Sequence, residues 1–153
     1  MHRRLVLFVC TGNQCRSPMA EYLLKVRLPH DSEWEVVSAG TSASDGFPAS
    51  HYAVEVMRER GVDISGHQST QLTIALIESA QLIVPMTASH RDTIVNAVPA
   101  SADKVRLMSS FDTSKAEKDV DDPMGQSREC YSRVRDEIEE GVSKMVMFLE
   151  TNN

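Results

Sequence analysis

Hydrophobic and polar positions alternate along this chain in two different periods. Short apolar, β-branched runs predict buried strands, and longer stretches with apolar residues three and four positions apart predict helices. The expected strands are 5–9, 34–37, 82–84 and 105–108. The expected helices are one that ends before Pro29, one around 54–57, a short one at 72–77, one at 88–97 and a last one through 131–149.

Turn and cap residues punctuate this pattern. Ser17 followed by Pro18 predicts the start of the first helix, with Ser17 as the N-cap and Pro18 as the first helical residue. Gly61 occupies the usual position just after the end of the second helix. The stretch 109–126 is polar and predicts a long loop.

Strands that alternate with helices predict one fold class. The expectation is an α/β protein with three layers, α/β/α, around a four-stranded parallel sheet, formed by residues 1–153 as a single domain. Ligands of such sheets bind beyond the carboxyl ends of the strands. The segment 10–17 follows the first strand directly, so it is the first candidate for a site.

Composition and charge narrow the choice of partners. Apolar residues make up 41% and charged residues 25% of the chain, which is ordinary for a globular protein. The net charge of -6 argues against binding to nucleic acid or to an anionic membrane. The longest apolar run is far too short to span a bilayer, and no signal peptide is recognisable, so we expect a cytoplasmic protein.

The chain has three cysteines: Cys10, Cys15 and Cys130. An odd, small number does not suit a disulfide framework, and their spacing does not suit zinc, so we expect neither a metal nor another cofactor. For Cys130 we expect the common role of a small buried hydrophobic residue. Cys10 and Cys15 lie together in the candidate segment, and their chemistry needs separate consideration.

The segment 10–17 has the features of a phosphate-binding loop. Gly12 permits a tight turn, and Asn13 tolerates a left-handed backbone conformation. Successive N–H groups and the start of the following helix can then face an anion, and Arg16 offers two parallel donors to phosphate oxygens. Cys10 would lie at the bottom of this electropositive loop, where the reactive thiolate is favoured.

The stretch 9–21, with the sequence VCTGNQCRSPMAE, resembles the N-terminal signature of the low-molecular-weight protein tyrosine phosphatases. Further matches are 38–41, His67 and the Asp122-Pro123 pair, so the resemblance covers essentially the whole chain. It implies a four-stranded parallel sheet, no metal, a cysteinyl-phosphate intermediate and a phosphorylated protein as the substrate.

The resemblance also implies a role for each matching residue. Cys10 would attack phosphorus, Arg16 would bind the phosphoryl oxygens, and Asp122 would protonate the leaving group and later activate water. Ser17 would donate a hydrogen bond to the Cys10 thiolate, while Asn13, Ser38 and His67 would hold the shape of the loop. The phosphate would be bound by the loop residues Thr11, Gly12, Asn13, Gln14, Cys15 and Ser17.

Two residues have alternative interpretations. Asp122 lies in an acidic stretch and could belong to an ordinary solvated turn, but a carboxylic acid is also the group that a departing oxyanion needs. Cys15 could be a small structural residue. It could instead be a resolving cysteine that forms a reversible disulfide with oxidised Cys10, and the resemblance supports that role.

The substrate is the least determined property. Thr11 and Gln14 are polar where tyrosine-specific members are usually apolar, and Met124 stands where an aromatic residue is common. Phe47 could supply an aromatic wall or anchor the core. A threonine at position 11 is similar to the pattern of the bacterial protein-arginine phosphatases of the same fold, although those enzymes carry threonine in place of Gln14. Phosphotyrosine is the first expectation and phosphoarginine is the alternative.

Two other activities are compatible with this fold. A thiol-coupled arsenate reductase would need two further cysteines in the middle of the chain, and none lies between Cys15 and Cys130. An inactive phosphate-binding module would lack the nucleophile or the acid, whereas Cys10, Arg16 and Asp122 are all present. We therefore expect a monomeric, cysteine-dependent protein phosphatase.

Overall fold

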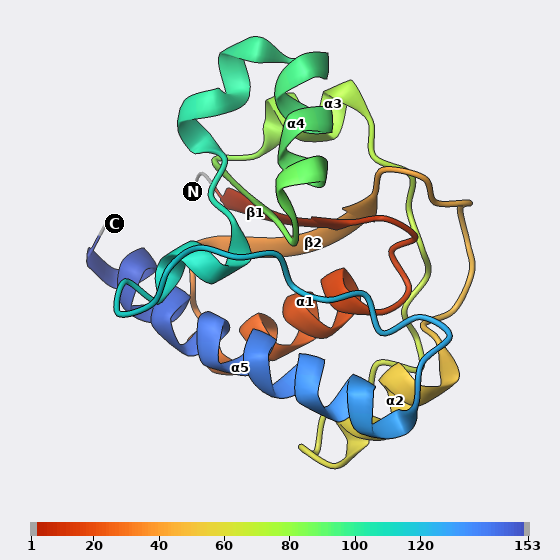
Figure 1. Ribbon diagram of the computed structural model, residues 1–153. Helices are drawn as coiled ribbons and strands as arrows, with labels where there is room; N and C mark the ends of the chain where they lie inside the picture. Colours follow the sequence, from red (N-terminus) through yellow and green to blue (C-terminus); the bar gives the residue numbers. More distant parts are fainter. Residues whose placement is uncertain (1–2, 152–153) are drawn as a thin grey trace.

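The computed structural model describes residues 3–151 and shows a parallel sheet between two helical layers (Figure 1). Its strands are β1 (Arg4–Cys10), β2 (Trp34–Gly40) and β3 (Leu82–Pro85), in the spatial order β2-β1-β3. Both outer strands run parallel to β1, as the pattern of alternating strands and helices predicts. The central strand is therefore the one that leads into the candidate loop.

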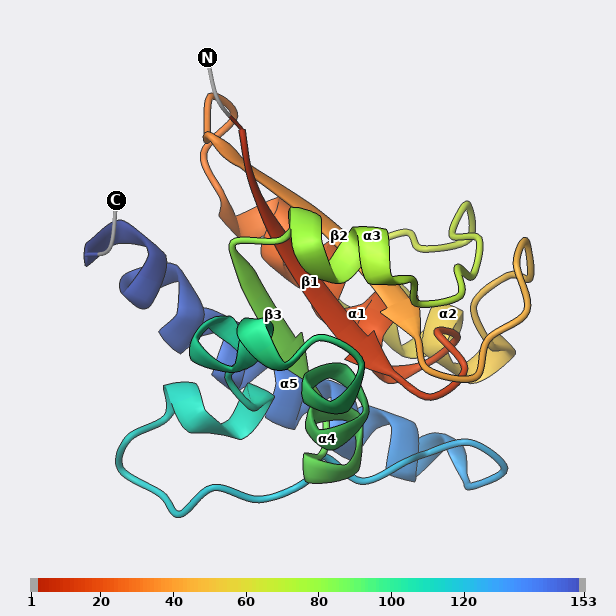
Figure 2. The same ribbon diagram turned by 90° about the horizontal axis from the view of Figure 1, so that it is seen from above.

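Helices cover both faces of the sheet (Figures 1 and 2). The α-helices of the described residues are α1 (Arg16–Arg27), α2 (His51–Arg58), α3 (Ile74–Ser79), α4 (Ala88–Ala97) and α5 (Arg128–Thr151). Two 3₁₀ helices, η1 (Pro99–Lys104) and η2 (Met108–Phe111), follow α4. One face carries α3 and α4, and the other carries α1, α2 and α5.

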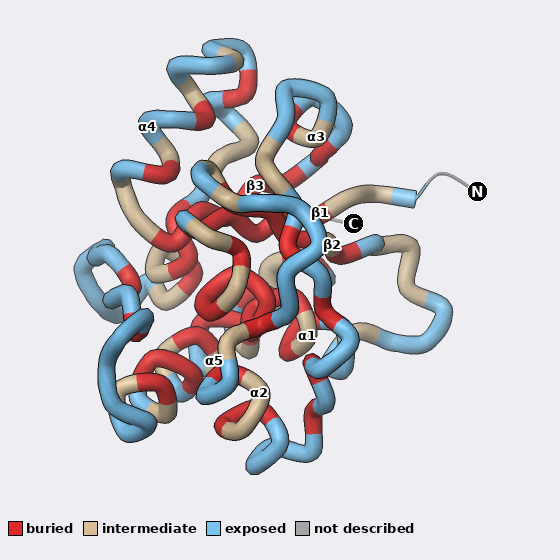
Figure 3. Tube along the Cα trace, turned by 90° about the vertical axis from the view of Figure 1, so that its right-hand side faces the viewer, coloured by how far each residue is buried: buried red, intermediate tan, exposed pale blue. Residues whose placement is uncertain are grey.

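The alternation of side chains along β1 divides the core into two parts. Leu7 and Val9 pack with residues of α3 and α4, whereas Val6, Phe8 and Cys10 pack on the side of α1, α2 and α5. Figure 3 shows this buried interior surrounded by exposed loops. The sulfur of Cys10 thus belongs to the same layer as the helix that follows it.

The expected fourth strand at 105–108 is wrong. Val105 forms a single parallel bridge with Ile83, and the N–H of Arg106 donates to the Ile83 carbonyl at 2.9 Å. The chain then turns into η2, because the N–H and the hydroxyl of Ser110 both bond to the Leu107 carbonyl. The short apolar run therefore pairs at one point and continues as a 3₁₀ helix, which leaves a three-stranded sheet.

The predicted start of the first helix is also wrong. Helix α1 begins at Arg16, and Cys15 stands at the N-cap position without a side-chain capping bond. Ser17 lies inside the helix because its hydroxyl contacts the Cys10 sulfur instead of capping the backbone. The predicted helix at 88–97 is confirmed as α4, the one at 72–77 lies two residues further along as α3, and that through 131–149 is confirmed within α5.

The solvent exposure of the Cys130 and Phe47 side chains tests two smaller expectations. Cys130 is half-buried at the start of α5, so it is not the fully buried residue expected, and Arg133 donates to its sulfur. Phe47 is 53% exposed, which excludes a role as a core anchor. Within residues 3–151, no helix has both the length and the apolar character to cross a membrane.

Candidate active site

The candidate loop, residues 10–17 and hereafter the phosphate loop, begins where the central strand ends. Strand β1 ends at Cys10, and the chain crosses to β2 on one side and later to β3 on the other. The strand order therefore reverses at β1, which is where parallel sheets open a crevice for ligands. The amino-terminal end of α1, which carries unpaired N–H groups and a partial positive charge, closes the loop.

Asn13 holds the phosphate loop from inside. Its φ of 57° is the left-handed conformation that the sequence predicts for it. Its Nδ2 donates to Ser17 Oγ at 2.8 Å and to Ser38 Oγ at 2.9 Å, and its Oδ1 accepts from the Thr70 N–H at 2.8 Å. His67 Nε2 contacts the Asn13 carbonyl at 2.8 Å. The four polar residues expected to shape the loop therefore form one buried network.

The direction of these bonds determines what Cys10 meets. Asn13 Nδ2 can only donate, so Ser17 Oγ accepts from it and keeps its own hydrogen for the Cys10 sulfur, 2.9 Å away. The sulfur is almost completely buried. A hydroxyl donor thus faces the atom that would carry the negative charge of a thiolate.

A buried carboxylate extends the network behind the loop. Ser38 donates to Glu21 Oε1 at 2.6 Å, and Lys25 lies 2.5 Å from Glu21 Oε2. Glu21 is 7% exposed, and its pairing with Lys25 offsets the cost of burying the charge. Glu21 lies within the stretch that carries the family resemblance, but its contact with Ser38 depends on how α1 packs against β2.

Gly40, at the end of β2, allows the backbone of the loop to approach. A Cβ atom at this position would lie 2.4 Å from the Thr11 carbonyl oxygen and 2.9 Å from the Asn13 nitrogen. The N–H groups of Thr41 and Ser42 donate to the carbonyls of Cys10 and Thr11, both at 2.9 Å. The backbone of the phosphate loop therefore packs directly against the backbone at the end of β2.

Arg16 connects the phosphate loop with the segment that carries the expected acid. Its buried guanidinium donates through Nη1 to the Val120 carbonyl at 2.9 Å, and its Nη2 lies 3.7 Å from Asp122 Oδ2. The Asp122 side chain is 53% exposed, and its Oδ1 accepts from the Met124 N–H at 3.0 Å. The fold thus brings residue 122 to the loop across more than a hundred positions of sequence.

A cavity of about 150 Å³ lies between the loop and this segment. Its lining comprises Cys10, Thr11, Gly12, Gln14, Cys15, Arg16, Asp122 and Met124. The nucleophile, the arginine and the carboxylate predicted from sequence therefore share one cavity. The remaining expected residues, Asn13, Ser17, Ser38 and His67, are not part of the lining and support the loop from behind.

Cys15 and Gln14 have neighbours on the other wall. The Cys15 sulfur lies 3.1 Å from Ser50 Oγ and 3.5 Å from the Tyr131 hydroxyl. Burial raises the pKa of the Cys15 thiol, and burial together with the bond to Cys15 raises the pKa of Tyr131 to about 12. Because its pKa is raised, Cys15 is a neutral thiol at neutral pH. On the same wall, Gln14 Nε2 donates to the Pro48 carbonyl at 3.0 Å.

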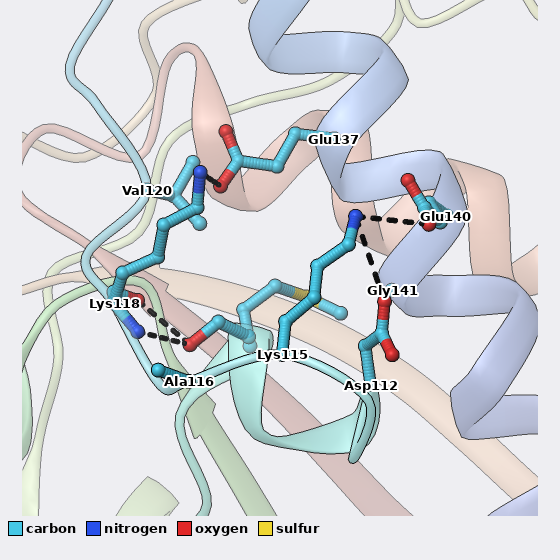
Figure 4. Close-up of a pocket in the computed structure, with 10 residues that line it drawn as sticks. Asp112, Lys115, Ala116, Lys118, Val120, Glu137, Glu140 and Gly141 are labelled. Atoms are coloured by element: carbon cyan, nitrogen blue, oxygen red, sulfur yellow. Dashed lines mark hydrogen bonds and ion pairs between the residues drawn. The ribbon is translucent and has the colours of Figure 1, made fainter.

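A second hollow, of about 60 Å³ and lined in part by Val120, lies between η2, the segment that follows it and α5 (Figure 4). Its charged residues pair with one another: Lys115 with Asp112 and Glu140, and Lys118 with Glu137. Charges paired in this way do not mark an anion or cation site. Across residues 3–151, no group of three or more His, Cys, Asp or Glu could hold a metal ion.

Two contacts of the site were not expected from the sequence. His90, from α4, lies 2.8 Å from the Thr11 hydroxyl, and the Val120 carbonyl holds Arg16. Neither residue belongs to a recognisable pattern, and each reaches a partner about 80 or 100 positions away. A backbone carbonyl leaves no trace in the choice of its own side chain, so no sequence signal could have revealed Val120.

A family model and several curated relatives match nearly the whole chain. Residues 5–153 match the family model described as "Low molecular weight phosphotyrosine protein phosphatase". A protein-arginine-phosphatase of Geobacillus stearothermophilus is 40% identical over 147 residues, which cover 95% of this chain and 96% of the relative. An arsenate reductase of Bacillus cereus matches at 32% identity over 143 residues, 94% of each chain.

Solved structures match over nearly the whole chain. The YwlE arginine phosphatase from Geobacillus stearothermophilus has a TM-score of 0.88 at 39% identity, covering 97% of this chain and 94% of that chain. A low molecular weight protein tyrosine phosphatase from T. tengcongensis has a TM-score of 0.87 at 40% identity, covering 94% and 98%. At 39% and 40% identity, both proteins resemble this chain in sequence as well as in fold.

Proposed function

Since the chain belongs to the low molecular weight phosphotyrosine protein phosphatase family, whose members use a cysteine, we propose that Cys10 is its nucleophile and Asp122 its general acid. The observation that supports this most directly is the shared cavity, in which the Cys10 sulfur, the Arg16 guanidinium and the Asp122 carboxylate meet. The proposed substrate is a phosphorylated protein side chain, with phosphotyrosine as the first candidate.

The first step follows from these positions. The Cys10 thiolate attacks phosphorus, the bond from phosphorus to the leaving oxygen breaks, and Asp122 gives that oxygen its proton. Arg16 binds two phosphoryl oxygens, and the loop N–H groups with the end of α1 stabilise the charge that develops on them. The products are a free phenol and a phosphate group bound to the Cys10 sulfur.

The second step reverses the role of the acid. Asp122, now a carboxylate, takes a proton from a water molecule as that water attacks the cysteinyl phosphate. The bond between sulfur and phosphorus breaks, inorganic phosphate leaves, and Cys10 returns to the thiolate. The hydroxyl of Ser17, 2.9 Å from the sulfur, stabilises the thiolate as leaving group just as it stabilises the thiolate as nucleophile.

The nucleophile is tested by comparing the wild type with Cys10→Ser on an aryl phosphate. We expect loss of at least about a thousandfold in kcat, because serine lacks an activating base here. Acid quenching of the wild type during turnover should trap phosphate on Cys10, detectable by mass spectrometry. A serine variant with wild-type activity would contradict the proposal.

Phosphoarginine is the second candidate substrate, and the geometry of Gln14 favours it. Because the amide nitrogen of Gln14 donates to the Pro48 carbonyl, its Oε1 is the group left to accept hydrogen bonds in the cavity. With Asp122, the wall offers two side chains that can accept, and the residues that line the cavity include no aromatic ring. Guanidinium N–H groups would suit such a wall better than a phenyl ring.

The two substrates are distinguished by one pair of peptides that differ only in phosphotyrosine or phosphoarginine. A higher kcat/KM for phosphoarginine, lowered in Gln14→Leu while phosphotyrosine hydrolysis is kept or raised, would assign the preference to Gln14. Equal loss of both activities in Gln14→Leu would instead show that Gln14 only supports the loop.

We infer that Cys15 is a resolving thiol. Peroxide would oxidise the Cys10 thiolate to a sulfenic acid, and the Cys15 sulfur would displace water from it to form a disulfide. Both thiols are free and buried next to the same cavity. After excess peroxide, thiol treatment should restore the wild type, whereas Cys15→Ser, which has no second thiol to trap the sulfenic acid, should be oxidised further to the sulfinic acid and stay inactive. Equal recovery of both would contradict this inference.

We also infer that the chain acts in the cytoplasm as a single-domain monomer. Both parts of the core lie against the same three-stranded sheet, which supports one domain. A reducing compartment would keep Cys10 as a thiol. Sedimentation at micromolar concentration should give the mass of one chain, 17.0 kDa.

A further inference from the structure

One buried histidine touches the phosphate loop without a part in the steps above. His90 lies in the first turn of α4 and is 5% exposed. Its Nε2 is 2.8 Å from Thr11 Oγ1, and its Nδ1 is 3.0 Å from Thr87 Oγ1. Thr11 lines the cavity, and Arg16 Nη2 donates to the same Thr11 oxygen at 3.4 Å. A line of contacts thus runs from Thr87 through His90 and Thr11 to Arg16.

The partners of Thr87 indicate which nitrogen of His90 carries the proton. Thr87 is the N-cap of α4, and its oxygen accepts from the His90 backbone N–H at 3.2 Å. The hydroxyl hydrogen of Thr87 can be donated to Nδ1, which lies 3.0 Å away. With Nδ1 as the acceptor, the ring proton is on Nε2, where it faces Thr11.

This arrangement fixes the hydroxyl of Thr11. A threonine oxygen has two lone pairs and one hydrogen. His90 Nε2–H and Arg16 Nη2–H occupy the two lone pairs, so the hydrogen of Thr11 remains to be donated. Since Thr11 lines the cavity, a phosphoryl oxygen bound there is the natural acceptor.

The ring stays neutral under the conditions in which a phosphatase works. Burial, and then the positive charge of Arg16, lower the pKa of His90 to about 4, against smaller opposing effects of Asp119 and Asp122. Above that pH the neutral ring keeps one acceptor and one donor. A protonated ring would donate from both nitrogens and could no longer accept from Thr87.

We propose that His90 is a positioning residue that orients the Thr11 hydroxyl, so that Thr11 donates to the bound phosphoryl group and accepts from Arg16. This inference rests on the proposed function, adds His90 to it and fixes the direction of the Thr11 hydroxyl. His90 touches no substrate atom itself, and its influence on catalysis passes through Thr11. The loss caused by removing His90 should therefore be contained in the loss caused by removing the Thr11 hydroxyl.

A double-mutant cycle tests this on an aryl phosphate. We expect Thr11→Val and His90→Phe each to lower kcat/KM by about tenfold, which corresponds to the loss of one hydrogen bond in the transition state. The double variant should lose no more than Thr11→Val alone. His90→Gln, whose amide can reach Thr11 with an N–H, should recover most of the activity. Losses that multiply to about a hundredfold would overturn the proposal.

Two threonine caps give a matched control. Thr87→Val removes the hydroxyl that fixes the His90 proton, whereas Thr73→Val removes the corresponding cap of α3, which bonds to the Leu76 N–H. Both variants lose a helix cap, but only Thr87→Val should lower kcat/KM. Equal kcat/KM of the two variants would contradict the proposal, because it would show that the position of the His90 proton does not affect the site.

A measurement on the wild type does not depend on mutants or on activity. The ¹⁵N chemical shifts of the His90 ring should show Nε2 protonated and Nδ1 bare from pH 8 down to about 5. The opposite tautomer would overturn the inference about Thr11 while leaving the roles of Cys10 and Asp122 intact. Failure of the Cys10→Ser test would instead overturn the proposed function itself, so the two failures can be told apart.

Discussion

The phosphate loop and the acid segment, defined as residues 113–127, face the same cavity but are held in opposite ways. In the phosphate loop, Asn13 alone makes three side-chain bonds, and the network continues through buried partners. In the acid segment, Val120 and Pro123 are buried while almost all other residues are exposed. Its anchors include the Val120 N–H, which bonds to the Met86 carbonyl, and Asp119, which accepts from the Ala88 N–H. The pairs of Lys115 with Glu140 and of Lys118 with Glu137 join exposed lysines to α5.

The difference corresponds to two chemical tasks. Binding and stabilising a phosphoryl group requires donors in fixed positions, because reorganisation during the reaction would reduce their effect. A general acid, the role proposed for Asp122, must instead serve leaving groups of different shape and must exchange its proton with water, which suits an exposed carboxylate. The guanidinium of Arg16 touches both regions and relates the position of one to the other.

The largest effect is expected inside the phosphate loop. Asn13→Ala removes three hydrogen bonds, two of them buried, and places alanine at a φ of 57°, so we expect about 2–4 kcal/mol lower stability and at least about a hundredfold lower kcat/KM. Urea unfolding and steady-state kinetics would measure the two. Asn13→Gly, which tolerates this backbone, separates the conformation from the side chain. Wild-type activity in Asn13→Ala would remove the contrast between the regions.

A change in the acid segment should affect catalysis and leave the fold intact. Asp122→Asn keeps the shape but cannot supply a proton, so kcat/KM for phenyl phosphate, which reports the first step, should fall by about a hundredfold. For nitrophenyl phosphate, whose leaving group needs less help, the fall in kcat/KM should be much smaller. Stability should change by less than about 0.5 kcal/mol, since the side chain is half exposed. A uniform loss with both substrates would argue against an acid role.

The contact between α4 and the loop predicts a pH dependence of stability. His90 has a pKa of about 4 in the folded protein and an ordinary value of 6.5, so the unfolded chain binds this proton more readily. The contribution of neutral His90 to the free energy of unfolding is present in full above pH 6.5 and is lost as the pH falls to 4 and below, on the order of 3 kcal/mol. Urea unfolding of His90→Gln should show a correspondingly flatter pH profile over that range. Parallel profiles would contradict a neutral, buried His90.

The smallest effect is expected at an anchor of the acid segment. Asp119→Ala removes the bond to the Ala88 N–H, 2.9 Å long and exposed, at the first turn of α4. We expect kcat/KM for phenyl phosphate to fall only about threefold and stability to fall by about 0.5–1 kcal/mol. The matched variant Asp121→Ala should change neither. A loss as large as that of Asp122→Asn would mean that the segment depends on this anchor.

The same contrast explains what the sequence revealed. The phosphate loop is one continuous stretch in which the glycine, the arginine and the start of the next helix are adjacent in sequence. The position of Cys10 and Arg16 at one cavity and the left-handed conformation of Asn13 could therefore be predicted locally. The contacts of His90 with Thr11 and of Arg16 with Val120 join residues 79 and 104 positions apart. They depend on how α4 and the acid segment pack, which no local pattern encodes.

The errors have the same origin. The run 105–108 has the composition of a strand, but it lies at the edge of the sheet beyond β3, where one bridge to Ile83 is formed before Ser110 closes a 3₁₀ turn. Ser17 has the composition of an N-cap, but the sulfur of Cys10 takes its hydroxyl. In both places a tertiary contact outweighed a correct local preference.

Gly40 has a consequence for how this site can vary. Since the floor of the loop rests on the backbone of β2 with no room for a side chain, main-chain atoms would set the depth at which a phosphoryl group meets the Cys10 sulfur. Gln14 and Met124, the side chains placed to meet the rest of a substrate, lie on the walls. Replacing these two side chains should therefore leave that depth unchanged. If the proposed function holds, reaction chemistry and substrate choice can be redesigned independently.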